Sequence, residues 1–397
     1  MKRVAISAAL LAVVHAGAGA QESLLPSTAW GFAPIASGWH FAKPLATANG
    51  AIQDVAQAAV PFQVRVQLGT RWNFDITGAY ASAAIHTTAD STTGGEDKVP
   101  LLTGPTDVKL RMSGPVLGDN VVFTAGVNLP VGTTKLNSDQ TSVLQTVGAP
   151  ALHMPIGAYG TGTGGTFGLI GVAEAGGWAL ALGASVEQRT EYTPIALAIS
   201  GGSSDTRLTP GTAAHVSLGG DRVIGQERLS FLVLADAYGT DKIVIASGGA
   251  ETGQTQYQLG PQYAAITRLD FGGGAWSEGA LTLSGRYRSA FNDANGKAVT
   301  GSAGTYLEGS LGGVLGGGGR VGLVLAVDGR WHSGLSFTNS LVGAAMTAAG
   351  ATIGLELPIG FRLTIQPQYG TFDTGTTRTT GVGGTVALSF FARKEAR

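Results

Sequence analysis

The strict alternation of apolar and polar residues along Thr305–Trp331 constrains the fold more than any other feature of this sequence. Leu325 and Val327 fall on one parity, whereas Asp328 and Arg330 fall on the other. A run of four glycines at 316–319 divides this stretch into two halves that both show the alternation. Side chains alternate between the two faces of a β-strand, so the stretch predicts a β-hairpin with one apolar and one polar face.

The same pattern recurs along almost the whole chain, which leaves little sequence to cover so many apolar faces. Beyond the first twenty residues there is no run of 18 or more apolar residues, so membrane-spanning helices are not expected. The other structure that satisfies all of its backbone hydrogen bonds inside a bilayer is a closed β-barrel. The sequence therefore predicts an all-β, transmembrane antiparallel barrel whose apolar faces contact lipid.

The composition agrees with this fold class. Charged residues make up 13% of the chain, against roughly 25% in typical soluble proteins. The chain has no cysteine, which excludes disulfides, thiolate metal sites and cysteine nucleophiles. The formal net charge of −1 predicts no strong attraction to nucleic acid.

The first twenty residues have the pattern of a secretory signal peptide. Lys2 and Arg3 precede an apolar run over 4–14, and Ala18-Gly19-Ala20 provides a small-residue cleavage site. We therefore expect a signal peptide over 1–20 and a single barrel domain over 21–397. Its expected location is the outer membrane of a Gram-negative-type envelope, with outer-membrane lipid and the barrel-assembly machinery as partners.

The connections between the expected strands alternate between short and long. Short Gly-rich turns are expected near residues 69, 118, 176, 220, 273, 317 and 359, and longer loops at about 44–54, 87–104, 131–162, 191–210, 239–254, 291–301, 334–348 and 373–379. This is the arrangement of outer-membrane barrels, with periplasmic turns and extracellular loops. It predicts about 16 strands, with Trp30–Phe41 as the first. If that segment instead forms a plug inside the barrel, the number is 14.

Charged residues in the clearly alternating strands fall on the polar parity. A lipid-facing arginine near the bilayer midplane costs roughly 2–4 kcal/mol, so these residues are expected to face a lumen. A barrel of this size leaves an aqueous channel. The predicted lining either gives a weak anion preference or consists of paired charges that only hydrate the wall. The expected pore-lining residues are Arg65, Asp75, Asp107, Lys109, Arg111, Glu187, Arg189, Arg228, Asp236, Arg286, Arg288, Glu308, Asp328, Arg330 and Arg362.

Several of the long loops are unusually apolar for segments that meet water. One hypothesis is that 131–162 folds into the barrel mouth and that apolar loop residues capture hydrophobic solutes. The alternative is that strands extend above the membrane and these residues pack loop against loop. The candidates for contact with a solute are Val143, Leu144, Leu152, Met154, Ile156 and Phe337.

No pattern in the sequence indicates catalysis, so we expect no enzyme activity, no cofactor and no metal site. The histidines are scattered and show no HxxxH or HExxH spacing. The match of 160–165 to GxGxxG lacks a following helix pattern. Asp119 and Asp221 are expected to be turn residues, because aspartate is favoured beside glycine in turns.

The segment Gly104-Pro105-Thr106-Asp107-Val108-Lys109-Leu110, the turn Gly118-Asp119-Asn120 and the strand end Leu129-Pro130-Val131-Gly132 resemble a pattern of outer-membrane proteins associated with phenol degradation. These are similar in style to the long-chain fatty-acid transporters. The resemblance implies uptake of hydrophobic or aromatic compounds. The tail Ala392–Arg397 departs from it, since such barrels usually stop at an aromatic residue.

Together these observations predict a passive channel or transporter for small hydrophobic or aromatic solutes. A general porin for small polar solutes and a structural or adhesion barrel are the two alternatives. The sequence leaves the solute and the oligomeric state open.

Overall fold

The computed structural model describes residues 30–391 apart from 48–49, 69–70, 89–96, 119, 200–201, 249, 274–275, 317–320, 339–340 and 359. The predicted signal peptide over 1–20, the predicted turn residue Asp119 and the tail 392–397 lie outside the described residues.

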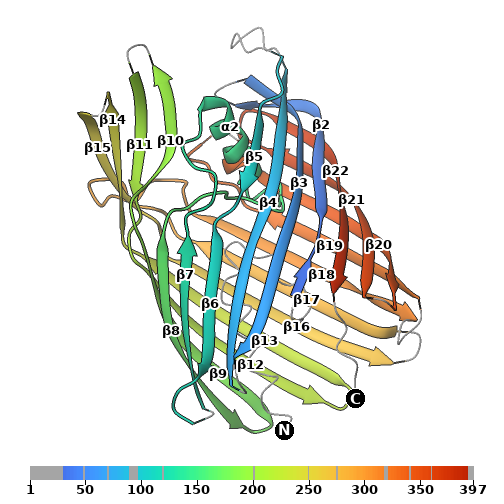
Figure 1. Cartoon of the computed structure of the whole chain (residues 1–397). Helices are drawn as coiled ribbons and strands as arrows, with labels where there is room; N and C mark the ends of the chain where they lie inside the picture. The colour runs from blue at the N-terminus through green and yellow to red at the C-terminus, as the bar shows by residue number, and fades with distance from the viewer. Residues whose placement is uncertain are drawn as a thin grey trace.

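The chain forms a closed, all-antiparallel barrel of 16 strands (Figure 1). Two of the wall strands are each divided in two by a short break, so the sheet contains 18 named strands. The wall consists, in chain order, of β1 (Trp30–Phe32) with β2 (Ile35–Thr47), β3 (Gly50–Leu68), β4 (Trp72–Thr88), β5 (Leu101–Pro105) with β6 (Val108–Pro115), β7 (Val121–Leu129), β8 (Gly164–Ala175), β9 (Trp178–Arg189), β12 (Ala213–Ile224), β13 (Glu227–Tyr238), β16 (Gln262–Gly273), β17 (Trp276–Arg288), β18 (Gly304–Gly316), β19 (Gly322–His332), β20 (Ala345–Leu357), β21 (Phe361–Asp373) and β22 (Arg378–Phe391).

The first strand belongs to the wall. Ile35 pairs with Ala387 and Phe41 pairs with Gly381, so β2 joins β22 and closes the sheet. On its other side β2 pairs with β3. The prediction of 16 strands is therefore confirmed, and the alternative of 14 strands with an amino-terminal plug is wrong.

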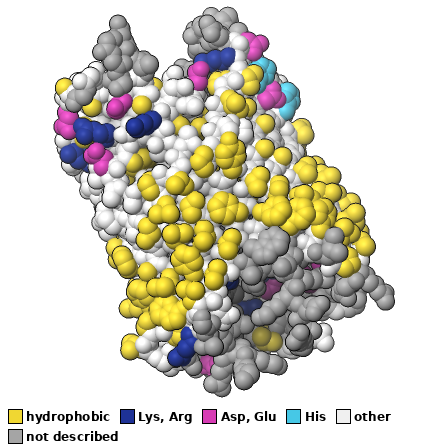
Figure 2. Space-filling view, viewed as in Figure 1, with side chains coloured by type: hydrophobic (Ala, Val, Ile, Leu, Met, Phe, Trp, Pro, Cys, Tyr) yellow, Lys and Arg dark blue, Asp and Glu magenta, His cyan; other side chains and the backbone are white. Residues whose placement is uncertain are grey.

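In the hairpin β18–β19, the alternation of apolar and polar residues places apolar side chains on the outer face and charged ones on the inner face. Leu307 lies opposite Trp331, and Glu308 lies opposite Arg330. Leu307 is 48% exposed and Val327 is 56% exposed, whereas Arg330 on the other parity is only 4% exposed. Exposed apolar side chains of the outer parity recur around the barrel. Figure 2 shows them spread across the middle of one face, with most charged residues at its upper end. We call these outward apolar residues the apolar belt.

The turn expected at Gly219-Gly220-Asp221 is wrong, because these residues lie inside β12. The strand continues to Ile224, and the turn is formed at Gly225, which has φ of 65°. Gly220 is needed within the strand, since a Cβ there would lie 2.3 Å from Cε1 of Phe231 on β13. The glycine thus marks a close approach of a neighbouring ring and not a turn.

Several of the expected loops are also largely β-structure. The loop expected at 44–54 is wrong, because β2 runs to Thr47 and pairs there with Gly50 of β3. The segments 191–210 and 239–254 form two hairpins beyond the barrel wall. These hairpins are β10 (Tyr192–Ile199) with β11 (Gly202–Thr209), and β14 (Thr240–Ser247) with β15 (Ala250–Gln258), and they join in the order β10-β11-β14-β15 (Figure 1).

The pattern of β4 reverses along its length. In its first half the inward residue is the buried Asp75, and the outward residues belong to the apolar belt, ending at the exposed Tyr80. In its second half the inward residues Ala81, Ala83 and Ile85 are apolar and buried. The strands therefore extend beyond the apolar belt, and the inner wall there is apolar.

Candidate functional site

The long segment 131–162, here called the inward loop, folds into the mouth of the barrel. It contains the helix α2 (Ser138–Val147), which begins at a capping box in which Asn137 accepts from Gln140 N and the Gln140 side chain accepts from Asn137 N. The side chains of Val143 and Val147 are buried. Figure 1 shows α2 inside the upper end of the barrel, behind β5.

The inward loop is held by one side of the inner wall, which we call the apolar sector. Its members are buried apolar side chains that form one cluster with the loop: Trp39, Phe41, Val55, Ala81, Ala83, Ile85, Leu102, Met346, Ala348 and Phe372. Full burial of a large apolar side chain contributes about 1.5–3 kcal/mol, so this cluster can hold the loop against the wall.

Two polar side chains add direction to this packing. Trp39 Nε1 donates to the carbonyl of Leu152 over 3.1 Å. Gln57 forms a pair of hydrogen bonds with the backbone of Ile156: its Nε2 donates to the carbonyl over 2.8 Å, and its Oε1 accepts from the amide over 2.7 Å. The part of the loop after α2 therefore has one position relative to β2 and β3.

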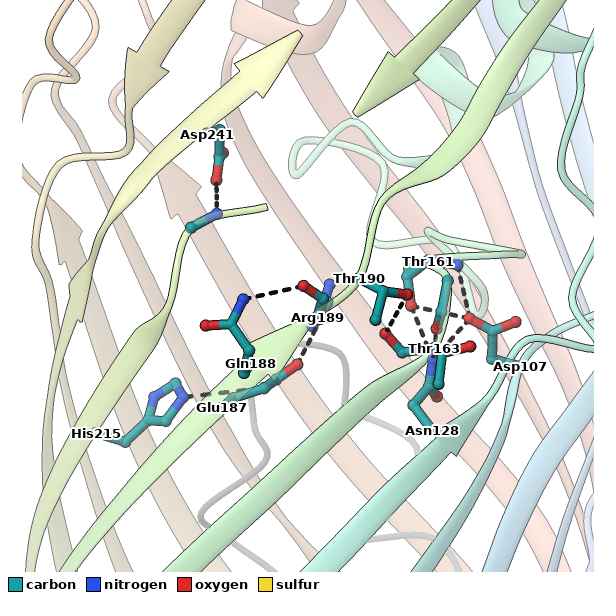
Figure 3. Close-up of polar contacts among 12 residues, drawn as sticks. Asp107, Asn128, Thr161, Thr163, Glu187, Gln188, Arg189, Thr190, His215 and Asp241 are labelled. Carbon is teal, nitrogen blue, oxygen red and sulfur yellow. Dashed lines mark hydrogen bonds and ion pairs between the residues drawn. The ribbon is translucent and has the colours of Figure 1, made fainter. Parts of the chain in front are cut away.

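Asp107, in the break between β5 and β6, ties the two ends of the inward loop together (Figure 3). Its Oδ1 accepts from the amide of Gly132 over 2.8 Å. Its Oδ2 accepts from the amide and the hydroxyl of Thr161 over 2.6 and 2.9 Å, and from Asn128 Nδ2 over 2.9 Å. A carboxylate that accepts several N–H and O–H groups makes strong charge-assisted bonds, so Asp107 acts as an anchor of the loop.

The structure places the loop residues that were candidates for contact with a solute in two groups. Val143, Leu152, Met154 and Ile156 are buried in the cluster with the apolar sector, and Leu144 packs against it. Phe337 lies apart from them, is 41% exposed and packs edge-on against Phe291 with ring centroids 5.2 Å apart. The first group therefore reaches a solute only if the inward loop moves.

The rest of the inner wall carries charged side chains, most of which have partners. In the lower wall, Asp75 Oδ1 accepts from Arg65 Nε over 2.6 Å, and Arg111 lies 3.5 Å from its other oxygen. Elsewhere the ion pairs are Arg189–Glu187, Arg228–Asp221, Arg362–Glu356 and the contact of His215 with Asp236. Figure 3 shows Glu187, Arg189 and His215 beside the anchor of the loop.

Two of these partners were missed by the sequence reasoning. Asp221 was expected in a turn, but it is a buried wall residue that accepts from Arg228 and Ser230. Glu356 is likewise buried. The alternation could have indicated Glu356, because its neighbour Leu355 belongs to the apolar belt. Asp221 was hidden by the glycines that precede it.

The inner wall of the strands from β9 to β19 forms what we call the polar sector, which adjoins the apolar sector where Arg330 lies opposite Ala348. Its members are Glu187, Arg189, His215, Asp236, Arg286, Arg288, Glu308, Asp328 and Arg330. Here Arg288 donates to Gln262 Oε1 over 2.9 Å, and Tyr306 Oη donates to Glu308 over 3.2 Å. Lys109, on β6, is exposed. No ion pair of Lys109 is found in the described part of the chain.

The inward loop reaches the polar sector through His153. Its ring centroid lies 6.4 Å from that of Tyr306 on β18. The side chain is exposed to the hollow interior, yet the barrel encloses it on all sides. This enclosure and the nearby Arg330 cation lower the pKa of His153 to about 4. His153 is therefore a neutral ring at pH 7.

Among the described residues, no group of three or more His, Cys, Asp or Glu side chains is arranged to hold a metal ion. In the same part of the chain, no helix has the length and apolarity needed to cross a membrane.

Comparisons with known proteins add only distant similarities. No protein-family model matches the chain, and no curated protein matches it. Among solved structures, the chain is similar to a bacterial polysaccharide outer membrane secretin (8% identity, 93% of this chain and 100% of that chain covered, TM-score 0.45). It is also similar to the outer membrane protein opdK from Pseudomonas aeruginosa (10%, 91% and 98%, 0.43) and to the CymD monoaromatic hydrocarbon channel (7%, 93% and 90%, 0.41). Similarity at this level identifies no solute, and the resemblance to the phenol-degradation proteins stays a prediction.

Proposed function

We propose that this protein is an outer-membrane channel for the passive uptake of small hydrophobic or aromatic solutes. Its location in the outer membrane and its export by residues 1–20 are part of the proposal. The apolar belt supports it, because outward apolar side chains around a closed barrel require lipid.

One observation carries the choice of solute. The inward loop buries its apolar side chains at the barrel mouth against a wall that is itself apolar. An apolar solute that enters this mouth can replace loop side chains against the apolar sector, whereas a polar solute cannot. The polar sector then provides a hydrated way onward beside the loop, lined by the charged residues that were expected to line a pore.

The proposal is tested by replacing 143–156 with a flexible Gly-Ser segment of the same length. We expect vesicle uptake of a hydrophobic solute to fall and uptake of a small polar solute to rise, because the same loop provides the apolar surface and narrows the bore. Unchanged hydrophobic uptake would contradict the proposal. A heat-modifiable band on a gel, which reports a folded barrel, controls for misfolding.

A general porin is the second candidate, and the ion-paired polar sector favours it. Planar bilayers separate the two functions. Large steady currents for the wild-type protein favour the porin, whereas small currents together with solute-specific uptake favour the transporter. A barrel with neither property would have the structural or adhesion role.

A further inference from the structure

Two buried or half-buried arginines of the polar sector differ from the ion-paired arginines of the inner wall. Arg65 and Arg111 share Asp75, and Arg362 is paired with Glu356. An arginine that is neutralised in this way has little charge to offer to a solute. Arg286 on β17 has no carboxylate partner among the described residues, and Arg330 on β19 has only a long contact with Asp328.

Arg330 is 4% exposed, and its Nη2 donates to Gln368 Oε1 over 2.5 Å. Its Nε and Nη1 have no hydrogen-bond partner among the described residues. Asp328 Oδ2 lies 4.0 Å from Nε, which is beyond hydrogen-bonding distance. A buried charged donor without a partner costs free energy of folding, so these two nitrogens are available to donate to an acceptor.

Arg286 lies next to this group. Its guanidinium carbon is 5.5 Å from the centre of the Tyr306 ring, and within the described chain no carboxylate lies within ion-pairing distance of it. The neighbouring Glu308 already accepts from the Tyr306 hydroxyl. In the strand register, Arg286 is opposite Tyr306 on β18, and Glu308 on that same strand is opposite Arg330. Arg286 therefore lies against the Tyr306 ring, and Arg330 lies diagonally from that ring on the next strand.

The inward loop provides a second ring at this place. His153 adopts φ of 51°, a left-handed conformation that is uncommon for residues other than glycine. In this conformation the ring of His153 faces that of Tyr306. Since His153 is neutral at pH 7, it adds an aromatic surface without adding a cation.

We infer that Arg330 and Arg286 bind the carboxylate of a small aromatic monocarboxylate, whose ring packs against the edges of the Tyr306 and His153 rings. Each guanidinium offers charge-assisted N–H donors to the carboxylate oxygens. Glu308 and Asp328 on the same wall disfavour a second negative charge, so a monocarboxylate fits better than a dicarboxylate. Because Arg330 is buried, the side chains around its Nε and Nη1 rearrange when the ligand binds. The inference rests on the proposed function and names one class among its aromatic solutes.

Calorimetric titration of the detergent-purified full-length protein tests the site. The probes are benzoate and benzyl alcohol, a neutral compound with the same ring, together with cyclohexanecarboxylate, which keeps the charge and lacks aromaticity. We expect benzoate to bind roughly tenfold more tightly than benzyl alcohol, because it adds hydrogen bonds to a charged group. Cyclohexanecarboxylate is expected to lie between them.

Arg330→Gln should weaken benzoate binding roughly tenfold and leave benzyl alcohol unchanged. Arg288→Gln is the matched control. It removes the same charge from the same inner wall, on β17, but its guanidinium already donates to Gln262, so we expect a change within about twofold. If Arg330→Gln lacks the heat-modifiable band of a folded barrel, Arg286→Gln provides the same comparison.

Absence of benzoate binding to the wild-type protein would overturn the inference, and so would an equal loss in Arg330→Gln and Arg288→Gln. The latter result would mean that the bulk charge of the lumen attracts the anion. Vesicle uptake of benzyl alcohol separates this failure from failure of the proposed function. If benzyl alcohol still enters while benzoate does not bind, only the carboxylate site is wrong. If benzoate binds while no aromatic solute enters, the site stands and the uptake function is wrong.

Discussion

The apolar and the polar sectors of the inner wall are made by the same strand alternation but have opposite effects on what fills the barrel. In the apolar sector, Ala81, Ile85 and Phe372 are buried against the inward loop. In the polar sector, Glu187 and Arg189 pair with each other and remain partly exposed to the interior. One sector therefore binds protein, and the other is left for water and solute.

The difference arises from how the two kinds of contact gain free energy. The free energy gained by apolar burial is roughly proportional to the area removed from water, so an apolar wall can hold a whole loop against it. Ion pairs at partly exposed positions contribute only about 0–1 kcal/mol each, so they do not draw a loop onto the wall. The outer face shows no such division, because the exposed side chains of the apolar belt recur around the barrel.

The strongest way to break this contrast is to place a charge in the apolar sector. Ala81→Asp puts a carboxylate without a partner at a fully buried position of the cluster. Burying it costs on the order of 3 kcal/mol or more. We expect the inward loop to leave the wall and single-channel conductance to rise severalfold. Ser185→Asp is the counterpart in the polar wall, opposite His215, and should change conductance little. Equal effects of the two substitutions would contradict the division into sectors.

The next largest effect is expected at the anchor of the inward loop. Asp107→Ala removes the acceptor shared by Gly132 and Thr161, at a cost of about 2–3 kcal/mol. The loop should then fluctuate, and current recordings should show frequent openings that are absent from the wild-type protein. Asp107→Asn retains one carbonyl acceptor and should give fewer openings. If both variants are as quiet as the wild type, the apolar sector alone holds the loop.

A substitution in the polar sector should alter selectivity more than stability. Glu187→Gln leaves the charge of Arg189 without its partner, so the reversal potential in a salt gradient should shift toward anions. The unfolding free energy should fall by less than about 1 kcal/mol, because both side chains are partly exposed. A large loss of stability would show that this sector also holds the fold together.

The smallest effect is expected at the rim, outside both sectors and beyond the apolar belt. The Nδ1 of His86 lies 3.0 Å from Asp54, and its Nε2 lies 2.9 Å from Asp97. The hydrogen bond to Asp54, and to a lesser extent the one to Asp97, raises the pKa of His86 above its ordinary 6.5. The raised pKa means that these contacts add stability below pH 6.5 and lose it as the pH rises through the value in the folded protein.

Thermal unfolding of the wild-type protein and of His86→Gln, followed from pH 5 to pH 9, measures this contribution. The two proteins should differ at the acid end and converge at the alkaline end. A difference that is constant across the range would exclude the titration of His86 as its cause.

Sequence alone determined the features of the protein that depend on neighbours along the strand. The alternation around Leu307 and Val327 predicts which side chains face outward, and the number of such stretches predicts 16 strands. This succeeds because the two faces of a strand are set by the backbone itself, and because a charge in lipid is so costly that the pattern permits few exceptions.

Only the tertiary structure decided where the inward loop lies and which wall it contacts. Leu152 and Ile156 pack among Trp39, Gln57 and Phe372. These wall residues come from strands that are far apart in the chain and become neighbours only when the barrel closes. The same holds for Asp107 between the two ends of the loop and for Nε and Nη1 of Arg330, which have no hydrogen-bond partner among the described residues. Such contacts are set by distances across the barrel, which a local pattern of residues does not contain.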